Sequence, residues 1–205
     1  MITEDALLNL RSKVKTLLSA QRFNHVLGVE EAAATLGRYC LPSKIGELRA
    51  AALLHDITKE ISSQKHIDIL KKNSVSVEDR VLENPHLLHS FSAPYVIAEN
   101  YPQFATPEIL SAVEKHTLGA DNMSIFDEII FISDYIELGR EYSSCIAVRE
   151  FLYSHLKNGD FQSNLLALHK ACIMSIDFTV KSLEDKNRFV HPRMLDAKKF
   201  LNSYL

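Results

Sequence analysis

Apolar residues recur at spacings of three and four along most of the chain, and this spacing predicts amphipathic helices. In the first such segment, from Thr3 to about residue 20, one face carries Leu7, Leu8, Val14, Leu17 and Leu18. The next segment starts at Arg22 and continues its apolar face to Leu36. Clean alternation of apolar and polar residues, which is typical of half-buried strands, is absent from the sequence. The pattern therefore predicts an all-α fold.

Capping residues and prolines mark where further helices begin. In chain order these signals are Ser62-Ser63, Asn84-Pro85, Thr106-Pro107 and a capping box from Ser124 to Asp127. Each of them stands just before a segment with helical periodicity. Gly159 separates two long segments near residues 144–158 and 160–184, and a last short helix is expected to end near Leu205.

The composition fits one compact domain over residues 1–205, because a chain of 205 residues with 46% hydrophobic residues can bury a sizeable core. The formal charge of −3 gives no overall attraction to nucleic acid or to an anionic membrane, so neither is an expected partner. The chain has three cysteines without a Cys-x-x-Cys pair, no signal-peptide pattern and no apolar run of about 18 residues. These features predict a cytoplasmic protein without a membrane span.

Two polar groups stand where burial should be costly. His55-Asp56 directly follows the apolar run at residues 50–54, and Asp134 interrupts the apolar segment that starts at Ile129. Burying an unpaired imidazole or carboxylate is unfavourable, so each needs a compensating partner. Both groups are common ligands of divalent ions, and a carboxylate can bridge two ions. This pattern favours a metal site.

Further histidines strengthen this hypothesis only as a group. By itself, each has a simpler interpretation as a core residue or as a charge near a helix end. Together with the dipeptide and Asp134, they form an ordered series from separate predicted helices, as in the metal sites of α-bundles. The series is His25, His55, Asp56, His89, His116 and Asp134. We interpret His66 as a solvated surface residue and His155 and His169 as structural.

This series and its flanking residues resemble those of the HD-domain metal-dependent phosphohydrolases, and specifically the YqeK-like family of symmetrical diadenosine tetraphosphate hydrolases. The similar segments cover nearly the whole chain. They are residues 22–29, residues 51–59, Asn84-Pro85 with His89, residues 115–119, residues 133–137 and His191-Pro192-Arg193. Ala120 and Leu138 depart from the family pattern, which often has Arg and Pro there, and His86 is additional to it.

The resemblance implies an HD-domain helical bundle with two divalent metal ions. Four residues would hold one ion, namely His25, His55, Asp56 and Asp134. His89 and His116 would hold the second ion, and Asp56 would bridge the two. The family is associated with iron, although the same ligand types suit manganese, cobalt or zinc.

The implied reaction is symmetrical cleavage of diadenosine tetraphosphate to two ADP by a metal-bridging hydroxide. Asp56 and Lys59 would be the catalytic residues. The expected substrate contacts are Lys59, Thr117, Gly119, Arg140 and Arg193. Lys59 would meet a phosphate as a point charge, and its simpler interpretation is an exposed lysine.

Two alternatives stay open at this point. The protein could be another HD-type nucleotide phosphohydrolase, such as a nucleotidase or a phosphodiesterase, or a non-catalytic nucleotide-binding module. The Gly-Tyr-Pro extension of cyclic dinucleotide phosphodiesterases is absent from the sequence, and its absence argues against a phosphodiesterase of that kind. The sequence leaves the metal, the nucleoside preference and the oligomeric state open, a homodimer included.

Overall fold

The computed structural model describes residues 2–205, and within that range it consists of helices and their connections, without a strand. The α-helices are α1 (Glu4–Lys15), α2 (Ala20–Cys40), α3 (Ile45–Leu54), α4 (Ser63–Lys72), α5 (Asp79–Leu82), α6 (Leu88–Asn100), α7 (Pro107–Lys115), α8 (Ile125–Ile136), α9 (Ser143–His155), α10 (Phe161–Glu184) and α11 (Pro192–Asn202). Short 3-10 turns are η1 (Pro42–Lys44), η2 (Pro85–Leu87) and η3 (Pro102–Phe104). The predicted all-α fold is confirmed.

Most of the predicted helix starts are confirmed by their capping bonds. The side chains of Thr3, Ser62 and Thr106 each accept a hydrogen bond from a backbone N–H in the first turn of the following helix. Ser124 and Asp127 form a complete capping box at the start of α8.

The prediction for Asn84 was wrong. Pro85 begins the 3-10 turn η2 instead of an α-helix, and α6 starts only at Leu88. The Asn84 side chain donates to the carbonyl of Arg80, 2.7 Å away, so it closes the preceding turn and does not cap the next helix.

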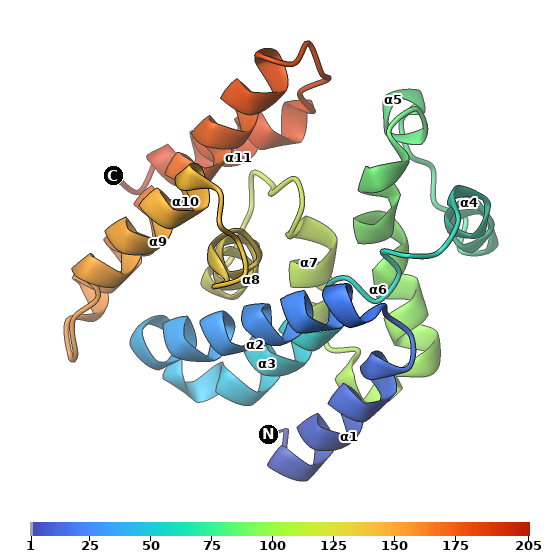
Figure 1. Cartoon of the computed structure of the whole chain (residues 1–205), viewed down its shortest axis with the longest axis horizontal. Helices are drawn as coiled ribbons and strands as arrows, with labels where there is room; N and C mark the ends of the chain where they lie inside the picture. The colour runs from blue at the N-terminus through green and yellow to red at the C-terminus, as the bar shows by residue number, and fades with distance from the viewer. Residues whose placement is uncertain (1) are drawn as a thin grey trace.

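Helix α8 lies at the centre of the bundle (Figure 1), where it packs against α2, α7 and α10. Its side chains Ile129, Ile130 and Ile132 are completely buried. Helix α2 also packs along α3, while α9 and α11 pack on α10. One continuous hydrophobic core runs from Leu7 in α1 to Leu201 in α11, which supports our proposal of a single domain.

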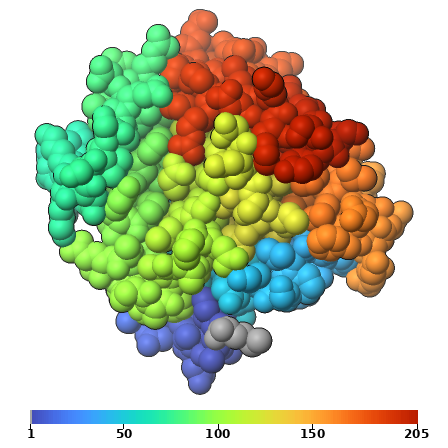
Figure 2. Space-filling view, turned by 180° about the vertical axis from the view of Figure 1, so that it is seen from behind, coloured from blue at the N-terminus to red at the C-terminus, as the bar shows by residue number. Residues whose placement is uncertain are grey.

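The view from behind shows the same order of layers (Figure 2). The yellow and yellow-green segment that contains α7 and α8 lies between the blue N-terminal helices and the red C-terminal helices. In the part of the chain from residue 2 onward, no helix combines the length and the apolar character needed to cross a membrane.

Candidate metal centre

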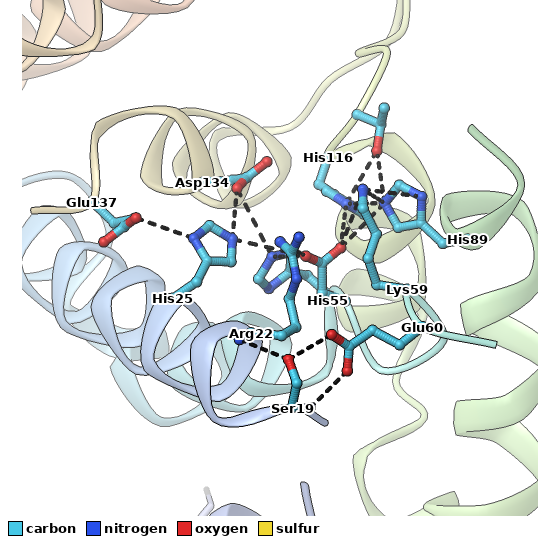
Figure 3. A network of polar contacts seen from close by, with 12 residues as sticks. Ser19, Arg22, His25, His55, Lys59, Glu60, His89, His116, Asp134 and Glu137 are labelled. Atoms are coloured by element: carbon cyan, nitrogen blue, oxygen red, sulfur yellow. Dashed lines mark hydrogen bonds and ion pairs between the residues drawn. The ribbon is translucent and has the colours of Figure 1, made fainter. Parts of the chain in front are cut away.

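Ends of five helices bring the predicted ligands together. His25 comes from the N-terminal part of α2, and His55-Asp56 follow α3 directly. His89 is the second residue of α6, His116 follows the last residue of α7, and Asp134 lies in the last turn of α8. In the close-up, His25 and Asp134 lie on one side of His55, and His89 and His116 lie on the other (Figure 3).

Asp56 lies between the two groups of ligands. Its Oδ2 atom is 3.8 Å from Nε2 of His25 and 3.5 Å from Nε2 of His55. Its Oδ1 atom is 3.2 Å from Nε2 of His89 and 3.7 Å from Nε2 of His116. Each oxygen of this single carboxylate therefore faces a different pair of imidazoles.

Asp134 completes the first group. Its Oδ1 atom lies 3.0 Å from Nε2 of His25 and 4.0 Å from Nε2 of His55. The structure thus brings together all six residues that the sequence singled out as ligands. Asp134 and His55, which come from different helices, are close enough to share one ion.

Hydrogen bonds behind the rings determine which imidazole nitrogen faces the cluster. His55, His89 and His116 each place Nδ1 at 2.6–2.7 Å from the backbone carbonyl three residues earlier in the chain. A carbonyl can only accept a hydrogen bond, so Nδ1 must carry the proton and Nε2 keeps its lone pair. His25 uses a carboxylate in the same way, because its Nδ1 lies 3.1 Å from Oε1 of Glu137. All four lone pairs point inward.

Several of the inward-facing atoms have no hydrogen bond. Among residues 2–205, Nε2 of His25, Nε2 of His55 and Oδ1 of Asp56 are buried and without such a partner. His25 Nε2 is near Asp134 Oδ1, but their angle does not meet hydrogen-bond geometry. Leaving such an atom unpaired costs about 1–3 kcal/mol. Divalent cations on the two sides of Asp56 would satisfy all three atoms, so these residues fit a metal.

The charge states suit metal binding. Burial by itself would raise the pKa of Asp56, but the adjacent His55, His116 and His89 hold this pKa well below its usual value. Burial likewise opposes ionisation of Asp134, yet the Arg140 guanidinium and the nearby imidazoles lower its pKa well below the usual range. Both carboxylates are therefore ionised at neutral pH.

His89 is held in the neutral form that binds metals. Burial is the main cause that lowers the pKa of His89 to about 3, and the neighbouring His116 and Lys59 act in the same direction. The nearby carboxylate of Asp56 acts against this shift without reversing it. The Nε2 lone pair of His89 is consequently available at neutral pH.

Lys59 and Thr117 lie beside the second pair of imidazoles. Lys59 Nζ is 3.0 Å from Nε2 of His89 and 3.7 Å from Oδ1 of Asp56. The Thr117 hydroxyl is 3.1 Å from Nε2 of His116 and 3.2 Å from Nε2 of His89. The Lys59 side chain is 28% exposed, so it is not an ordinary surface lysine, and burial lowers its pKa.

Two arginines approach the other side of the cluster. Arg140 donates to Oδ1 of Asp134 at 2.7 Å and to the Asp134 carbonyl at 3.1 Å. Arg22 donates to Oδ2 of Asp56 at 2.8 Å, and the sequence analysis did not select it. Its position three residues before His25 on a helix places both side chains on one face, and this spacing was the available signal.

Glu137 is a second residue that the sequence analysis missed. Its carboxylate is 5% exposed, and besides its bond to His25 it accepts from the backbone N–H of Gly139 at 2.6 Å. A Cβ atom on Gly28 would lie 2.5 Å from Oε2 of Glu137. The absence of a side chain at Gly28 therefore makes room for the carboxylate that orients His25.

Two of the predicted substrate contacts are engaged elsewhere. Gly119 has a φ of +69° and donates its N–H to the carbonyl of Lys115 at 2.8 Å, so it ends the turn after α7. Arg193 donates to Oε1 of Glu114 at 2.6 Å. A phosphate would have to displace these bonds to use either group.

The remaining histidines divide into buried and exposed ones. The interpretation of His66 as solvated surface was wrong, because it is 3% exposed and its Nδ1 lies 2.7 Å from the Ser92 hydroxyl. His169 is buried against Oε2 of Glu128 at 2.7 Å, outside the cluster. The side chain of His86 is exposed, and only its carbonyl supports the site by accepting from His89.

Comparison with known proteins agrees with this geometry. The chain is 31% identical to the symmetrical bis(5'-nucleosyl)-tetraphosphatase of Halalkalibacterium halodurans over 183 residues, which is 89% of each protein. It is 28% identical to the protein of the same name from Bacillus subtilis, over 87% of this chain and 88% of that one.

A solved structure shares the fold. The crystal structure of a predicted HD superfamily hydrolase involved in NAD metabolism, from Clostridium acetobutylicum, matches the whole of both chains with a TM-score of 0.83 and 29% identity. The family model of the HD domain matches residues 22–139, which include every predicted metal ligand. Because this match covers more than half of the sequence, the chain belongs to the HD-domain family.

Proposed function

We propose that this protein is a hydrolase that cleaves diadenosine tetraphosphate symmetrically into two molecules of ADP. The observation that carries the proposal is the arrangement about Asp56, whose two oxygens face different pairs of imidazole nitrogens. The names of the relatives from H. halodurans and B. subtilis, which match nearly nine-tenths of the chain, support this substrate.

We infer that the cluster holds two divalent ions. His25, His55 and Asp134 would hold one ion together with Oδ2 of Asp56. His89 and His116 would hold the other together with Oδ1 of Asp56. Iron is the proposed metal because the YqeK-like resemblance implies it, while manganese, cobalt and zinc also suit these ligands. Such a pair, when bound, supplies an activated water and positive charge for the phosphoryl oxygens.

The chain itself supplies the groups that would bind the phosphates. The side chains of Arg22, Lys59 and Arg140 are 29%, 28% and 33% exposed, so a phosphate can reach each of them from solvent. Charge-assisted hydrogen bonds to phosphate are roughly twice as strong as neutral ones. The Thr117 hydroxyl can donate to the same groups. These residues would hold the phosphates beside the cluster while the attacked phosphoryl lies at Asp56.

Hydrolysis in oxygen-18 water, followed by mass spectrometry, tests the position of the cut. We expect one labelled and one unlabelled ADP per turnover of diadenosine tetraphosphate. Formation of ATP and AMP would contradict symmetrical cleavage. Turnover of a mononucleotide without turnover of diadenosine tetraphosphate would instead favour another HD-type nucleotide phosphohydrolase.

A further inference from the structure

Two cavities meet at the metal-ligand cluster. The first, which we name the α2 cavity, has a volume of about 760 Å³, and its lining includes Arg22, Asn24, His25, Glu31, Arg140 and Tyr142. The second, the α10 cavity, has a volume of about 530 Å³, and its lining includes Lys59, His116, Tyr135, Arg140, Tyr142 and Phe178. Each cavity therefore reaches a different histidine of the cluster, and Arg140 and Tyr142 lie between the two.

The positive charges are divided between the cavities in the same way. Arg22 lines the α2 cavity and bonds to Oδ2 of Asp56 at 2.8 Å. Lys59 lines the α10 cavity and lies 3.7 Å from Oδ1 of the same carboxylate. In the close-up, Arg22 lies near His25 and His55, whereas Lys59 lies on the side of His89 and His116 (Figure 3). The α2 cavity thus has Arg22 of its own, the α10 cavity has Lys59 and Lys186, and the two cavities share Arg140.

The walls of the two cavities differ in chemistry. In the α10 cavity, Phe131, Tyr135 and Phe178 supply aromatic surface, and Phe178 is 39% exposed. Aromatic rings of this kind can stack on a nucleobase. In the α2 cavity, the wall contains the amide of Asn24 and the carboxylate of Glu31, which can hydrogen-bond to ribose hydroxyls and to base edges.

Tyr142 stands at the junction with an unusually exposed ring. It is 71% exposed although it is a large aromatic side chain, and it lines both cavities. Leu138, in the same connection between α8 and α9, is 70% exposed and lines the α2 cavity. Exposed apolar side chains beside a polar cluster are typical of ligand-binding surfaces.

We propose that the α2 and α10 cavities each bind one nucleoside half of a dinucleoside tetraphosphate, with Arg22 and Lys59 binding the phosphates of the respective halves. This inference rests on the proposed function. A substrate that is cut in its middle has two identical nucleoside diphosphate halves, so each half needs its own space and its own cation on either side of the attacked phosphoryl. Both cavity volumes lie within the ordinary range for small-molecule sites, about 300–1,000 Å³.

Filling each cavity separately tests the assignment. Asn24→Trp fills the α2 cavity and Ser182→Trp fills the α10 cavity, and both positions are exposed on their helices. We would measure kcat/KM for diadenosine tetraphosphate and for adenosine 5'-tetraphosphate, which has a single nucleoside. The wild type should prefer the dinucleotide by about 10-fold or more, because a bound base contributes that much affinity.

The two variants should then behave differently. Asn24→Trp should lower kcat/KM for the dinucleotide to the level of adenosine 5'-tetraphosphate. The kcat/KM for adenosine 5'-tetraphosphate itself should stay within about two-fold of the wild-type value. Ser182→Trp should lower both values, because the single nucleoside is expected in the aromatic cavity. Arg38→Trp on α2 and Lys170→Trp on α10 are matched controls at exposed positions outside both cavities, and they should change neither value.

A titration of the metal-loaded protein with ADP gives an independent measurement. We expect two ADP per chain for the wild type and one for each cavity-filling variant. One ADP per wild-type chain, or an equal loss for both substrates in Asn24→Trp, would overturn the inference. If Asn24→Trp does not fold, Glu31→Trp fills the same cavity. Absence of wild-type turnover of diadenosine tetraphosphate would overturn the proposed function, whereas the ADP titration would still judge the two cavities.

Discussion

Replacing Glu137 by glutamine tests how His25 is held in position. The carboxylate accepts two hydrogen bonds, at Oε1 from His25 Nδ1 and at Oε2 from the N–H of Gly139. A glutamine amide has one accepting oxygen and one donating nitrogen, so one of the two N–H groups would face another donor. The side chain has little room to turn away, because it is packed against Gly28.

The magnitude follows from the bond that is lost. A hydrogen bond to a charged group is worth about 1.5–3 kcal/mol. Partners of metal-binding histidines change metal affinity by about 10–100-fold when mutated, and this corresponds to roughly 1.4–2.8 kcal/mol. The two ranges agree. We therefore expect Glu137→Gln to bind metal about 10–100-fold more weakly at the His25 side of the cluster.

Competition with a chelator, followed by the absorption spectrum of the cobalt-loaded protein, would measure this change without relying on activity. Glu128→Gln is the matched control, because Glu128 is also buried and pairs with a histidine, His169, outside the cluster. This control should keep the metal affinity of the wild type. If Glu137→Gln kept the wild-type metal affinity, or if Glu128→Gln lost as much metal affinity as Glu137→Gln, the proposal that Glu137 positions His25 would be refuted.

Other substitutions separate metal binding from phosphate binding. Asp56→Ala should lose both metals and activity because Asp56 faces all four imidazole nitrogens, and elemental analysis with a turnover assay checks this. Lys59→Ala should keep both metals and lose mainly substrate affinity or rate, because a protonated lysine cannot ligate a metal. Equal metal loss in Asp56→Ala and Lys59→Ala would be inconsistent with these roles. Removing metal with a chelator should lower the Tm by roughly 5–10 °C, relative to protein in a free metal concentration of 100 times the dissociation constant. An unchanged Tm in differential scanning calorimetry would contradict metal binding by the folded state.

The helices could be predicted because their signals are local. Thr3, Ser62 and Thr106 cap helices through bonds to residues three positions away, and such bonds follow from the sequence alone. Asn84 has the same local pattern, but the carbonyl of Arg80 competes for its side chain. The choice between these two partners depends on how the preceding turn folds, and the dipeptide does not contain that information.

The convergence of the six proposed ligands could be predicted because their burial is costly, whereas the groups around them could not. An imidazole or carboxylate among apolar residues is conspicuous in any sequence. Arg22 is an ordinary helix-surface residue until the fold brings it to Asp56, which is 34 positions away in the chain. Glu137 likewise is conspicuous only through its distant partner His25. His66 was misjudged for the same reason, because Ser92 lies on another helix.

The position of the cluster at helix ends explains why it can be both buried and accessible. Neighbouring residues within an α-helix project about 100° apart, so His55 and Asp56 could not both reach one site from its middle. They lie in the turns that follow α3, where Asp56 faces His89 and His116 and the ring centroid of His55 lies 5.0 Å from that of His116. In the middle of the bundle, packed helices would enclose such a cluster on all sides. Where helices end, the connections between them leave space, and the two cavities on either side of Asp56 lie in that space. The same geometry that lets one carboxylate serve two groups of ligands therefore also leaves room for a substrate with two halves.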